Sequence, residues 1–304
     1  MDIFDPVTQD LPIIDPEFPA SKSPVVFYSD GCKILGTIFL ASGKELHATA
    51  IMLIGFPGNE SNADIAYMLR RQGFNVLTFY YRGSWGSEGI YSWANLLSDT
   101  HAAYIFLKDK SSIEKYRIDE KKIFFIGHSM GGFSALYNSV FLDEVKNICA
   151  LAPFNAGYFG KFLNANLPIK NYSVQKMLDS MDFVKCNSAE SLLDEMIEHQ
   201  NDWDLINHIE KLKEKNILMI AAKYDTTAPM EIHHNPLIKK FEMRNPKCET
   251  ENQTLNLNNS TLNISVLDTG HSFSDKRIKL MKLISEWAEQ IKNTDKDYEF
   301  TRRF

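Results

Sequence analysis

A serine in the pentapeptide GHSMG, residues 127–131, is the residue of this chain best placed to act as a nucleophile. The pentapeptide fits a G-x-S-x-G pattern, and it lies between an apolar strand predicted over residues 123–126 and a helix predicted over residues 130–141. This context favours a sharp, strained turn that projects the serine hydroxyl above a sheet, where flanking glycines avoid collisions. The pattern therefore predicts covalent catalysis by Ser129.

Two further residues could activate that serine, because a nucleophilic hydroxyl needs a general base and the base needs an orienting carboxylate. Asp225 follows a strand predicted over residues 217–222, and His271 follows a strand predicted over residues 264–267. Both would lie at the carboxyl ends of strands, the edge at which α/β sheets bind ligands, and they occur in the chain order expected after such a serine. We therefore expect a catalytic triad of Ser129, Asp225 and His271.

Several other residues compete for these roles. Asp268 is a rival acid, but it lies too close in sequence to the candidate histidine to face it easily. His128 belongs to the serine turn and cannot swing onto the hydroxyl without disrupting that turn. His233 and His234 fall in a predicted helix, where we expect them on the surface. Together with Glu231 they could suggest a metal site, but no third ligand has recognisable spacing, so no metal and no cofactor is predicted.

Two backbone N–H groups are expected to stabilise the oxyanion that forms when the serine attacks a carbonyl. One belongs to Met130, which follows the nucleophile at the start of its helix. The other should come from residues 55–59, the loop after a strand predicted over residues 48–54. Pro57 has no N–H, so Phe56 is the expected donor, although a Pro-Gly pair is also common in ordinary turns between a strand and a helix.

A glycine-rich loop, residues 82–89, follows a strand predicted over residues 74–81. The glycine spacing fits neither of the phosphate-binding loop patterns, so a tight structural crossover is the favoured interpretation. Trp85 of this loop is expected to border the substrate pocket.

The elements that would position these residues alternate between strands and helices. Short apolar runs at residues 25–28 and 34–40 flank an Asp-Gly pair, which is a hairpin signal, and Ser61 with Asp64 resembles a capping box at the start of a helix. Beyond them, near-continuous apolar strands alternate with amphipathic helices, which indicates a mostly parallel sheet covered on both faces. The predicted fold class is therefore α/β.

Two stretches interrupt this alternation. Residues 155–199 are predicted to form short helices, with Tyr158, Phe159 and Phe162 near their start, and residues 246–263 are polar and are expected to form an exposed loop. The predicted organisation is one α/β core with a lead, a helical cap insertion and a tail: lead 1–23, core 24–154 and 200–292, cap 155–199, tail 293–304.

Composition narrows the function classes. Of the 304 residues, 44% are hydrophobic and 24% are charged, and the formal charge of −6 argues against a nucleic-acid partner, which would require a basic face. No apolar run is long enough to span a bilayer, and the N-terminus lacks the basic start and apolar segment of a signal peptide. The four cysteines lie far apart without redox or metal spacing, so we expect a cytoplasmic protein.

Taken together, these motifs resemble those of the α/β-hydrolase superfamily, in particular its small esterases and lipases of the cinnamoyl-esterase and monoglyceride-lipase kind. The resemblance spans residues 25–290 and implies an α/β-hydrolase fold in which Ser129 is the nucleophile, His271 the base and Asp225 its orienting acid. It also implies the two oxyanion donors named above and a cap that covers an acyl pocket. The residues expected to bind substrate beside that pocket are Trp85, Tyr158, Phe159 and Phe162.

Two positions depart from the family pattern. Ile54 stands where many relatives have a histidine before the oxyanion glycine, and Tyr80 stands where many have an aspartate before the Arg-Gly pair. Residues 81–84 are more similar to the prolyl-oligopeptidase-like branch, which usually carries a large propeller domain for which this chain has no room. Peptidase activity therefore ranks second.

The sequence thus predicts a cofactor-independent serine hydrolase that cleaves carboxylic esters with a small to medium apolar acyl group through an acyl-enzyme. A peptidase, an amidase, a thioesterase or an acyltransferase would use the same triad. A ligand-binding member of the fold without turnover is the alternative from another class, because fold alone does not establish function. The expected partner is a small-molecule ester, and the sequence predicts no oligomeric state.

Overall fold

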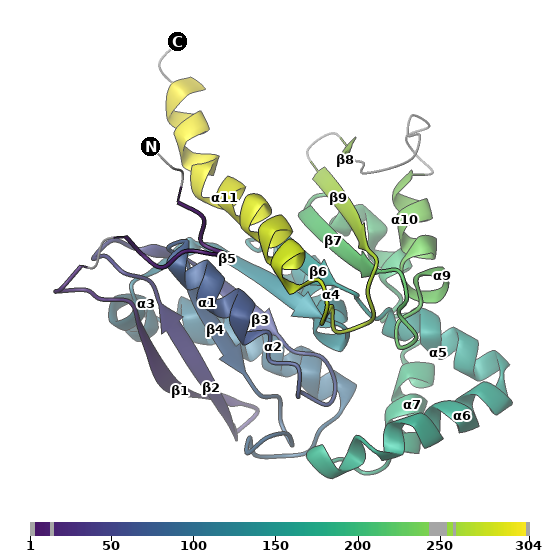
Figure 1. Ribbon diagram of the computed structural model, residues 1–304. Coiled ribbons are helices and arrows are strands. Elements are labelled where there is room, and N and C mark those ends of the chain that lie inside the picture. Colours follow the sequence, from purple (N-terminus) through teal and green to yellow (C-terminus); the bar gives the residue numbers. More distant parts are fainter. Residues whose placement is uncertain (1–3, 13–14, 243–253, 258–259, 302–304) are drawn as a thin grey trace.

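The computed structural model describes residues 4–12, 15–242, 254–257 and 260–301 (Figure 1). Within these residues, nine strands form one sheet with the order β1-β2-β4-β3-β5-β6-β7-β9-β8. The strands are β1 (Ser21–Ser29), β2 (Cys32–Leu40), β3 (His47–Leu53), β4 (Asn75–Phe79), β5 (Ile118–His128), β6 (Asn147–Leu151), β7 (Asn216–Ala222), β8 (Thr254–Leu257) and β9 (Ser260–Leu267).

The central strands of the sheet, from β4 to β9 in spatial order, run parallel to one another. Antiparallel pairs lie at the two edges, where β1 and β2 form the predicted hairpin and β8 pairs with β9. In the hairpin, Ser29 is opposite Cys32, and Asp30 and Gly31 between them both adopt positive φ, as a two-residue hairpin turn of this kind requires. The parallel arrangement brings the carboxyl ends of the central strands to one edge of the sheet.

Helices cover both faces of this sheet. On one face, α1 (Ala63–Arg71) and α11 (Arg277–Thr301) lie side by side (Figure 1), and the Gln72 side chain donates to the carbonyl oxygen of Ser285 at 2.9 Å. The opposite face is covered by α2 (Trp93–Lys108) and α4 (Met130–Phe141). The other helices are α3 (Lys110–Tyr116), α5 (Ala156–Ala165), α6 (Leu167–Leu178), η1 (Met181–Phe183), α7 (Ala189–Glu198), η2 (Leu205–His208), α8 (Ile209–Leu212), α9 (Met230–His233) and α10 (Asn235–Glu242).

Alternate side chains of the buried strands enter two separate hydrophobic cores. In β3, Ile51 and Leu53 belong to the core under α2 and α4, whereas Ala50 and Met52 belong to the core under α1 and α11. Because both faces are buried, both sets of side chains are apolar, and the strand reads as a continuous apolar run. The predicted α/β class, with a mostly parallel sheet covered on both faces, is confirmed.

The N-terminal lead contributes to the hydrophobic core. Val7 is 8% exposed and packs in the core under α1 and α11. The Arg71 side chain holds the lead in place by donating from Nε to the carbonyl oxygen of Pro6 at 2.7 Å. A single valine among prolines and acidic residues carries no periodicity, so the sequence pattern could not reveal this contact.

The start of α1 also differs from the prediction. Its N-cap residue is Asn62, at φ 50°, and no side-chain hydrogen bond caps the helix, so the expected capping box of Ser61 and Asp64 is wrong. The Asp64 carboxylate instead pairs with the Arg277 guanidinium of α11, with Nε and Oδ2 2.7 Å apart. The Asp64 side chain, which the local spacing assigns to the helix cap, therefore forms a tertiary ion pair instead.

The polar stretch at residues 246–263 is only partly outside regular structure. Residues 254–257 form β8, and β9 begins at Ser260, because backbone pairing can hold a polar strand at a sheet edge. Residues 243–253 and 258–259 of the predicted loop lie outside the described residues. At the other end, α11 continues to Thr301, past the position at which the prediction ends the core.

Residues 155–199 contain the expected short helices, α5, α6, η1 and α7, here called the helical segment. Figure 1 shows these helices grouped at one end of the molecule, away from both termini. Among the described residues, no helix combines the length and the apolar character needed to cross a membrane.

Candidate active site

Ser129 occupies a strained turn between β5 and α4. Its backbone adopts φ 57° and ψ −119°, a combination that costs energy for any residue with a side chain and that persists only where the surroundings enforce it. The enforcing contacts come from the neighbouring strand: the Ser129 N–H donates to the Leu151 carbonyl oxygen at 2.9 Å, and the Phe154 N–H donates to the Ser129 carbonyl oxygen at 3.0 Å. The turn has the form expected from the GHSMG sequence.

The glycines around this turn are required by close backbone approaches. A Cβ atom on Gly127 would lie 2.1 Å from the Gly131 carbonyl oxygen, and a Cβ on Gly131 would lie 2.1 Å from the carbonyl oxygen of Leu53. Neither neighbour is a flexible side chain that could move aside. The turn that carries Ser129 is thus packed directly against the end of β3.

Asp225 and His271 meet at the carboxyl ends of β7 and β9. The His271 Nδ1 lies 2.6 Å from the Asp225 Oδ2, and the Asp225 side chain is fully buried. The other carboxylate oxygen, Oδ1, accepts from the N–H groups of Thr227 and Ala228, each at 2.8 Å. Since the carboxylate can only accept, Nδ1 carries the hydrogen and Nε2 is left with its lone pair when the ring is neutral.

The surroundings of Asp225 keep its carboxylate ionised. Burial by itself would raise the pKa of this group, but the hydrogen bond and positive charge of His271 and the N–H donors of Ala228 and Thr227 outweigh it, so the pKa lies below its usual value. A charged carboxylate can stabilise the imidazolium that forms when His271 accepts a proton.

The rival acid, Asp268, faces elsewhere. Its carboxylate lies 3.0 Å from the Lys223 ammonium, and its side chain is 65% exposed. The structure therefore pairs His271 with Asp225, as the sequence order indicated.

The two expected oxyanion donors lie beside the serine. A Cβ on Gly55 would come within 2.9 Å of the Ser129 Cβ, which places the 55–59 loop directly against the turn that carries Ser129. Among the described residues, the N–H groups of Phe56 and Met130 donate to no protein acceptor. The Phe56 ring packs against Trp93, with ring centroids 5.4 Å apart, and this contact fixes the loop from its other side.

Trp85 joins the 55–59 loop, which carries the expected oxyanion donor Phe56, to the helical segment. Its indole N–H donates to the Pro57 carbonyl oxygen at 2.7 Å, and its ring stacks on Phe183 at 5.6 Å. The glycine-rich loop that contains Trp85 makes a second bond to the helical segment, in which the Gly83 carbonyl oxygen accepts from the Lys185 N–H at 2.6 Å. The glycine-rich loop, residues 82–89, therefore contacts both the 55–59 loop and the helical segment, and Trp85 remains 41% exposed.

Of the aromatic residues expected to bind substrate, Phe159 is connected to the serine turn through Phe154. Its ring packs against Phe154 at 5.1 Å, and Phe154 is the residue whose N–H bonds to the Ser129 carbonyl. Phe162 stacks behind Phe159 at 6.4 Å and is 36% exposed, while Tyr158 is half-buried on the same helix.

The expectation that His233 and His234 lie on the surface is wrong. They are 2% and 0% exposed, in a helix too short for its sequence to show which side is buried. The His233 Nδ1 accepts from the Asn155 N–H at 3.0 Å, and the His234 Nε2 donates to the Pro153 carbonyl oxygen at 3.0 Å. Burial lowers the pKa of His233 to about 3 and that of His234 to about 4, so both rings are neutral.

His128 is a further site residue that the sequence reasoning set aside. Its Nε2 donates to the backbone carbonyl oxygen of His271 at 2.9 Å, and the two rings lie 4.8 Å apart. Its position immediately before the candidate nucleophile was the only signal for this contact. No group of histidine, cysteine, aspartate and glutamate side chains suited to a metal ion occurs within the described ranges.

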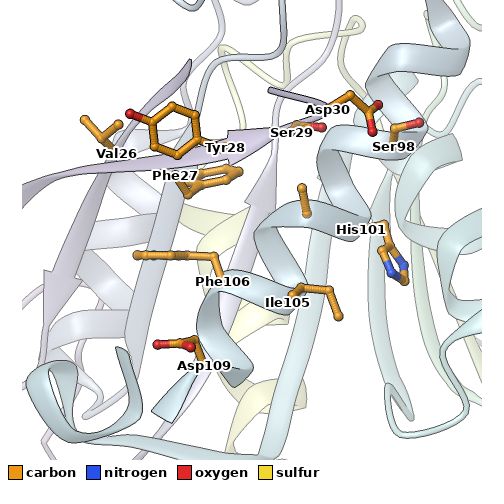
Figure 2. A pocket seen from close by; sticks show the side chains of 11 residues that line it. Val26, Phe27, Tyr28, Ser29, Asp30, Ser98, His101, Ile105, Phe106 and Asp109 are labelled. Atoms are coloured by element: carbon orange, nitrogen blue, oxygen red, sulfur yellow. The ribbon is translucent and has the colours of Figure 1, made fainter. Parts of the chain in front are cut away.

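A groove of about 670 Å³ lies far from these residues, between β1 and α2. Figure 2 shows Phe27 and Phe106 on its floor and the side chains of Tyr28, Ile105 and His101 around it. Because β2, β4 and β3 separate β1 from β5 in the sheet, this groove is distinct from the candidate active site.

No protein-family model matches the chain, and no curated protein matches it either. Among solved structures, it is similar to the Pyrococcus furiosus esterase Pf2001, with 20% identity, coverage of 90% of this chain and 91% of that chain, and a TM-score of 0.62. Est1E from Butyrivibrio proteoclasticus with bound ferulic acid is similar at 16% identity, coverage of 88% and 98%, and a TM-score of 0.63. The α/β hydrolase GrgF from Penicillium sp. sh18 is similar at 17% identity, coverage of 90% and 98%, and a TM-score of 0.62.

Proposed function

Because the chain has the α/β-hydrolase fold, we propose that it is a serine hydrolase of carboxylic esters. The observation that supports this most directly is the 2.6 Å hydrogen bond between Asp225 and His271, at the strand ends beside a serine with φ 57°. The bond fixes the tautomer in which the His271 Nε2 can accept a proton, which is what a serine nucleophile requires.

In the proposed reaction, the Ser129 Oγ attacks the acyl carbon while its proton passes to the His271 Nε2. The carbonyl oxygen becomes an oxyanion that accepts from the N–H groups of Phe56 and Met130. The bond between the acyl carbon and the alcohol oxygen then breaks, and His271 returns the proton to that oxygen. Water hydrolyses the resulting ester of Ser129 by the same steps, with His271 again taking and returning the proton.

The proposed acyl site is apolar and aromatic. Phe159 of α5 packs on Phe154 next to the serine turn, and Phe56 presents its half-buried ring from the oxyanion loop. These surfaces favour a small to medium apolar acyl group, and Trp85, Tyr158 and Phe162 are assigned to the same substrate site. The structure of Est1E with bound ferulic acid, a carboxylic acid, supports this assignment by its similar fold.

Labelling with a fluorophosphonate probe tests the proposal, because the probe reacts only with an activated serine. Wild-type protein should be labelled and Ser129→Ala should not, while replacement of the exposed Ser98 by alanine should leave labelling unchanged. With nitrophenyl esters of increasing acyl length, Ser129→Ala should lose at least about 10³-fold of kcat. Folded wild-type protein that resists the probe would contradict the proposal and favour a ligand-binding protein, whereas turnover of amides or thioesters alone would redirect it to those substrates.

A further inference from the structure

His128 occupies an unusual position, because it belongs to the nucleophile turn and yet its side chain binds the loop that carries the candidate base. It is the last residue of β5, immediately before Ser129, and it is 4% exposed. Its Nε2 lies 2.9 Å from the carbonyl oxygen of His271, and its ring is tilted by 41° to the His271 ring at 4.8 Å. The Phe273 ring closes the other side at 6.3 Å.

The chemistry of this contact defines the state of the His128 ring. A carbonyl oxygen can only accept, so the hydrogen must be on Nε2, and Nδ1 carries the lone pair. Nδ1 is buried without a partner among the described residues, so the ring gains nothing there that would favour a second proton. Burial, together with the charge that His271 gains on protonation, lowers the pKa of His128 to about 3. The donor is therefore neutral even when His271 is an imidazolium.

Other bonds hold the loop that carries His271 from different directions, including one from α11, where the Arg277 Nη1 donates to the Ser272 carbonyl oxygen at 3.2 Å. Asp225 holds the ring of His271 from the β7 side, and that bond fixes its tautomer but comes from a different strand end. The bond from His128 instead links the backbone of His271 to the residue adjoining Ser129. Displacement of a reacting group by about 1 Å can cost about 100-fold in rate, so a direct link of this kind is valuable.

We propose that His128 is a positioning residue that sets the separation of Ser129 from His271 by donating a hydrogen bond to the His271 carbonyl. This inference rests on the proposed function, in which these two residues exchange a proton. His128 itself does not touch the reacting atoms. Its hydrogen bond keeps the loop that contains His271 at a fixed position relative to the turn that contains Ser129.

A matched pair of variants separates the hydrogen bond from the volume of the side chain. In His128→Gln the amide nitrogen can reach the place of Nε2, whereas His128→Met has nearly the same length and shape but no donor. His128→Asn is a second variant without the contact, because its amide nitrogen stops at the level of Nδ1. Circular dichroism and the midpoint of thermal unfolding identify the variants that fold.

Steady-state kinetics with a nitrophenyl ester give the first readout. We expect kcat of His128→Met and His128→Asn to fall by about 10- to 100-fold with little change in KM, because substrate binding does not use this bond. His128→Gln should stay within a few-fold of wild type. Equal kcat values for the glutamine and methionine variants would overturn the proposal, as would a loss confined to KM.

The proton shared by the His271 Nδ1 and Asp225 gives a second readout that needs no turnover. Its downfield NMR resonance should be sharp in wild type and in His128→Gln, and broadened or lost in His128→Met, because the imidazole then moves. If the resonance changes in this way but wild-type protein is not labelled by the fluorophosphonate probe, the positioning role is retained and the proposed function is rejected. An unchanged resonance in the methionine variant would reject the positioning role, whatever the activity.

Discussion

The carboxyl edge of the sheet and the helical segment are held in place by different kinds of contact. At the edge, main chain meets main chain: the Ser129 N–H bonds to Leu151, the Ala152 N–H bonds to Ile220, and Gly131 packs on the backbone of Leu53. These contacts arise wherever parallel strands end together beside a tight turn. They place the turn that carries Ser129, whereas His271 is also held by the side chains of Asp225 and His128.

The helical segment is held by the backbone of Lys185 and, in addition, by particular side chains. The Glu195 carboxylate of α7 accepts from the N–H groups of Trp93 and Ala94 at the start of α2, at 2.7 and 3.0 Å, and the Trp93 indole N–H donates to the Leu192 carbonyl oxygen at 2.8 Å. Near α5, Asp204 accepts from the Asn155 amide at 3.1 Å. Each of these bonds depends on the identity of one residue.

This difference teaches that the two regions should fail in different ways. Substitutions at the carboxyl edge should abolish the proposed ester hydrolysis while the protein still folds. The exceptions are substitutions that add atoms to the turn around Ser129, which should also lower stability. Changes in the helical segment should alter stability and the shape of the acyl site while Asp225 and His271 stay paired.

The largest expected effect comes from Asp225→Asn, which tests whether a substitution at the carboxyl edge can abolish activity without loss of stability. The amide can donate to the His271 Nδ1 and so favours the wrong tautomer, and kcat should fall by about 10⁴-fold. Because the change preserves volume, the thermal unfolding midpoint should stay close to that of wild type. Ester kinetics beside circular dichroism measure both, and a kcat within tenfold of wild type would remove the assigned role of Asp225.

A smaller effect should distinguish two glycines with equally close backbone neighbours. A Cβ on Gly131 would meet the Leu53 carbonyl oxygen at 2.1 Å, and a Cβ on Gly160 of α5 would meet the Met196 carbonyl oxygen at 2.0 Å. Substitution of either by alanine should lower the free energy of unfolding by about 3 kcal/mol, the upper end of the range for overpacking.

The two alanine variants should differ in their reaction with the fluorophosphonate probe. Gly131→Ala should lose labelling because the nucleophile turn opens, and Gly160→Ala should keep it. Gly270→Ala is the stability control, since a Cβ there meets no atom within 4 Å. Labelling lost equally in Gly131→Ala and Gly160→Ala would show that the edge depends on the helical segment.

The smallest effect concerns acid stability at the junction of the two regions. His234 is neutral when folded, with its pKa at about 4, whereas the unfolded chain binds a proton below about pH 6.5. The unfolded state therefore binds more protons as the pH falls through this window, and the folded state loses stability. At pH 5 the loss should be about 2 kcal/mol for this group.

His234→Gln keeps a donor for the Pro153 carbonyl but cannot titrate, so it should be about 2 kcal/mol more stable relative to wild type at pH 5 than at pH 7. Urea unfolding at several pH values measures the difference. Between pH 7 and 8 the two proteins should show the same pH dependence. Parallel stability curves down to pH 5 would contradict the burial of a neutral histidine at this junction.

Much of the candidate site could be predicted because its signals are local. The GHSMG turn, the two-residue hairpin and the strand ends before Asp225 and His271 each occupy a few consecutive residues. The burial of His233 could not be predicted, because a four-residue helix has no periodicity and its environment comes from the Phe154 and Phe159 rings. The predicted capping role of Asp64 was wrong for a similar reason, since its partner Arg277 is more than 200 residues away along the chain.

The sequence by itself determined the chemical groups of the candidate site and the order in which the strands deliver them. A glycine-flanked serine after an apolar strand, and an acid and a histidine after later strands, need only local backbone preferences and the rule that parallel strands end together. Only the tertiary structure decided which carbonyl His128 binds, that His233 and His234 are buried, and how the helical segment docks. These contacts join residues far apart in the chain, and their energies depend on burial and geometry that no short stretch of sequence contains.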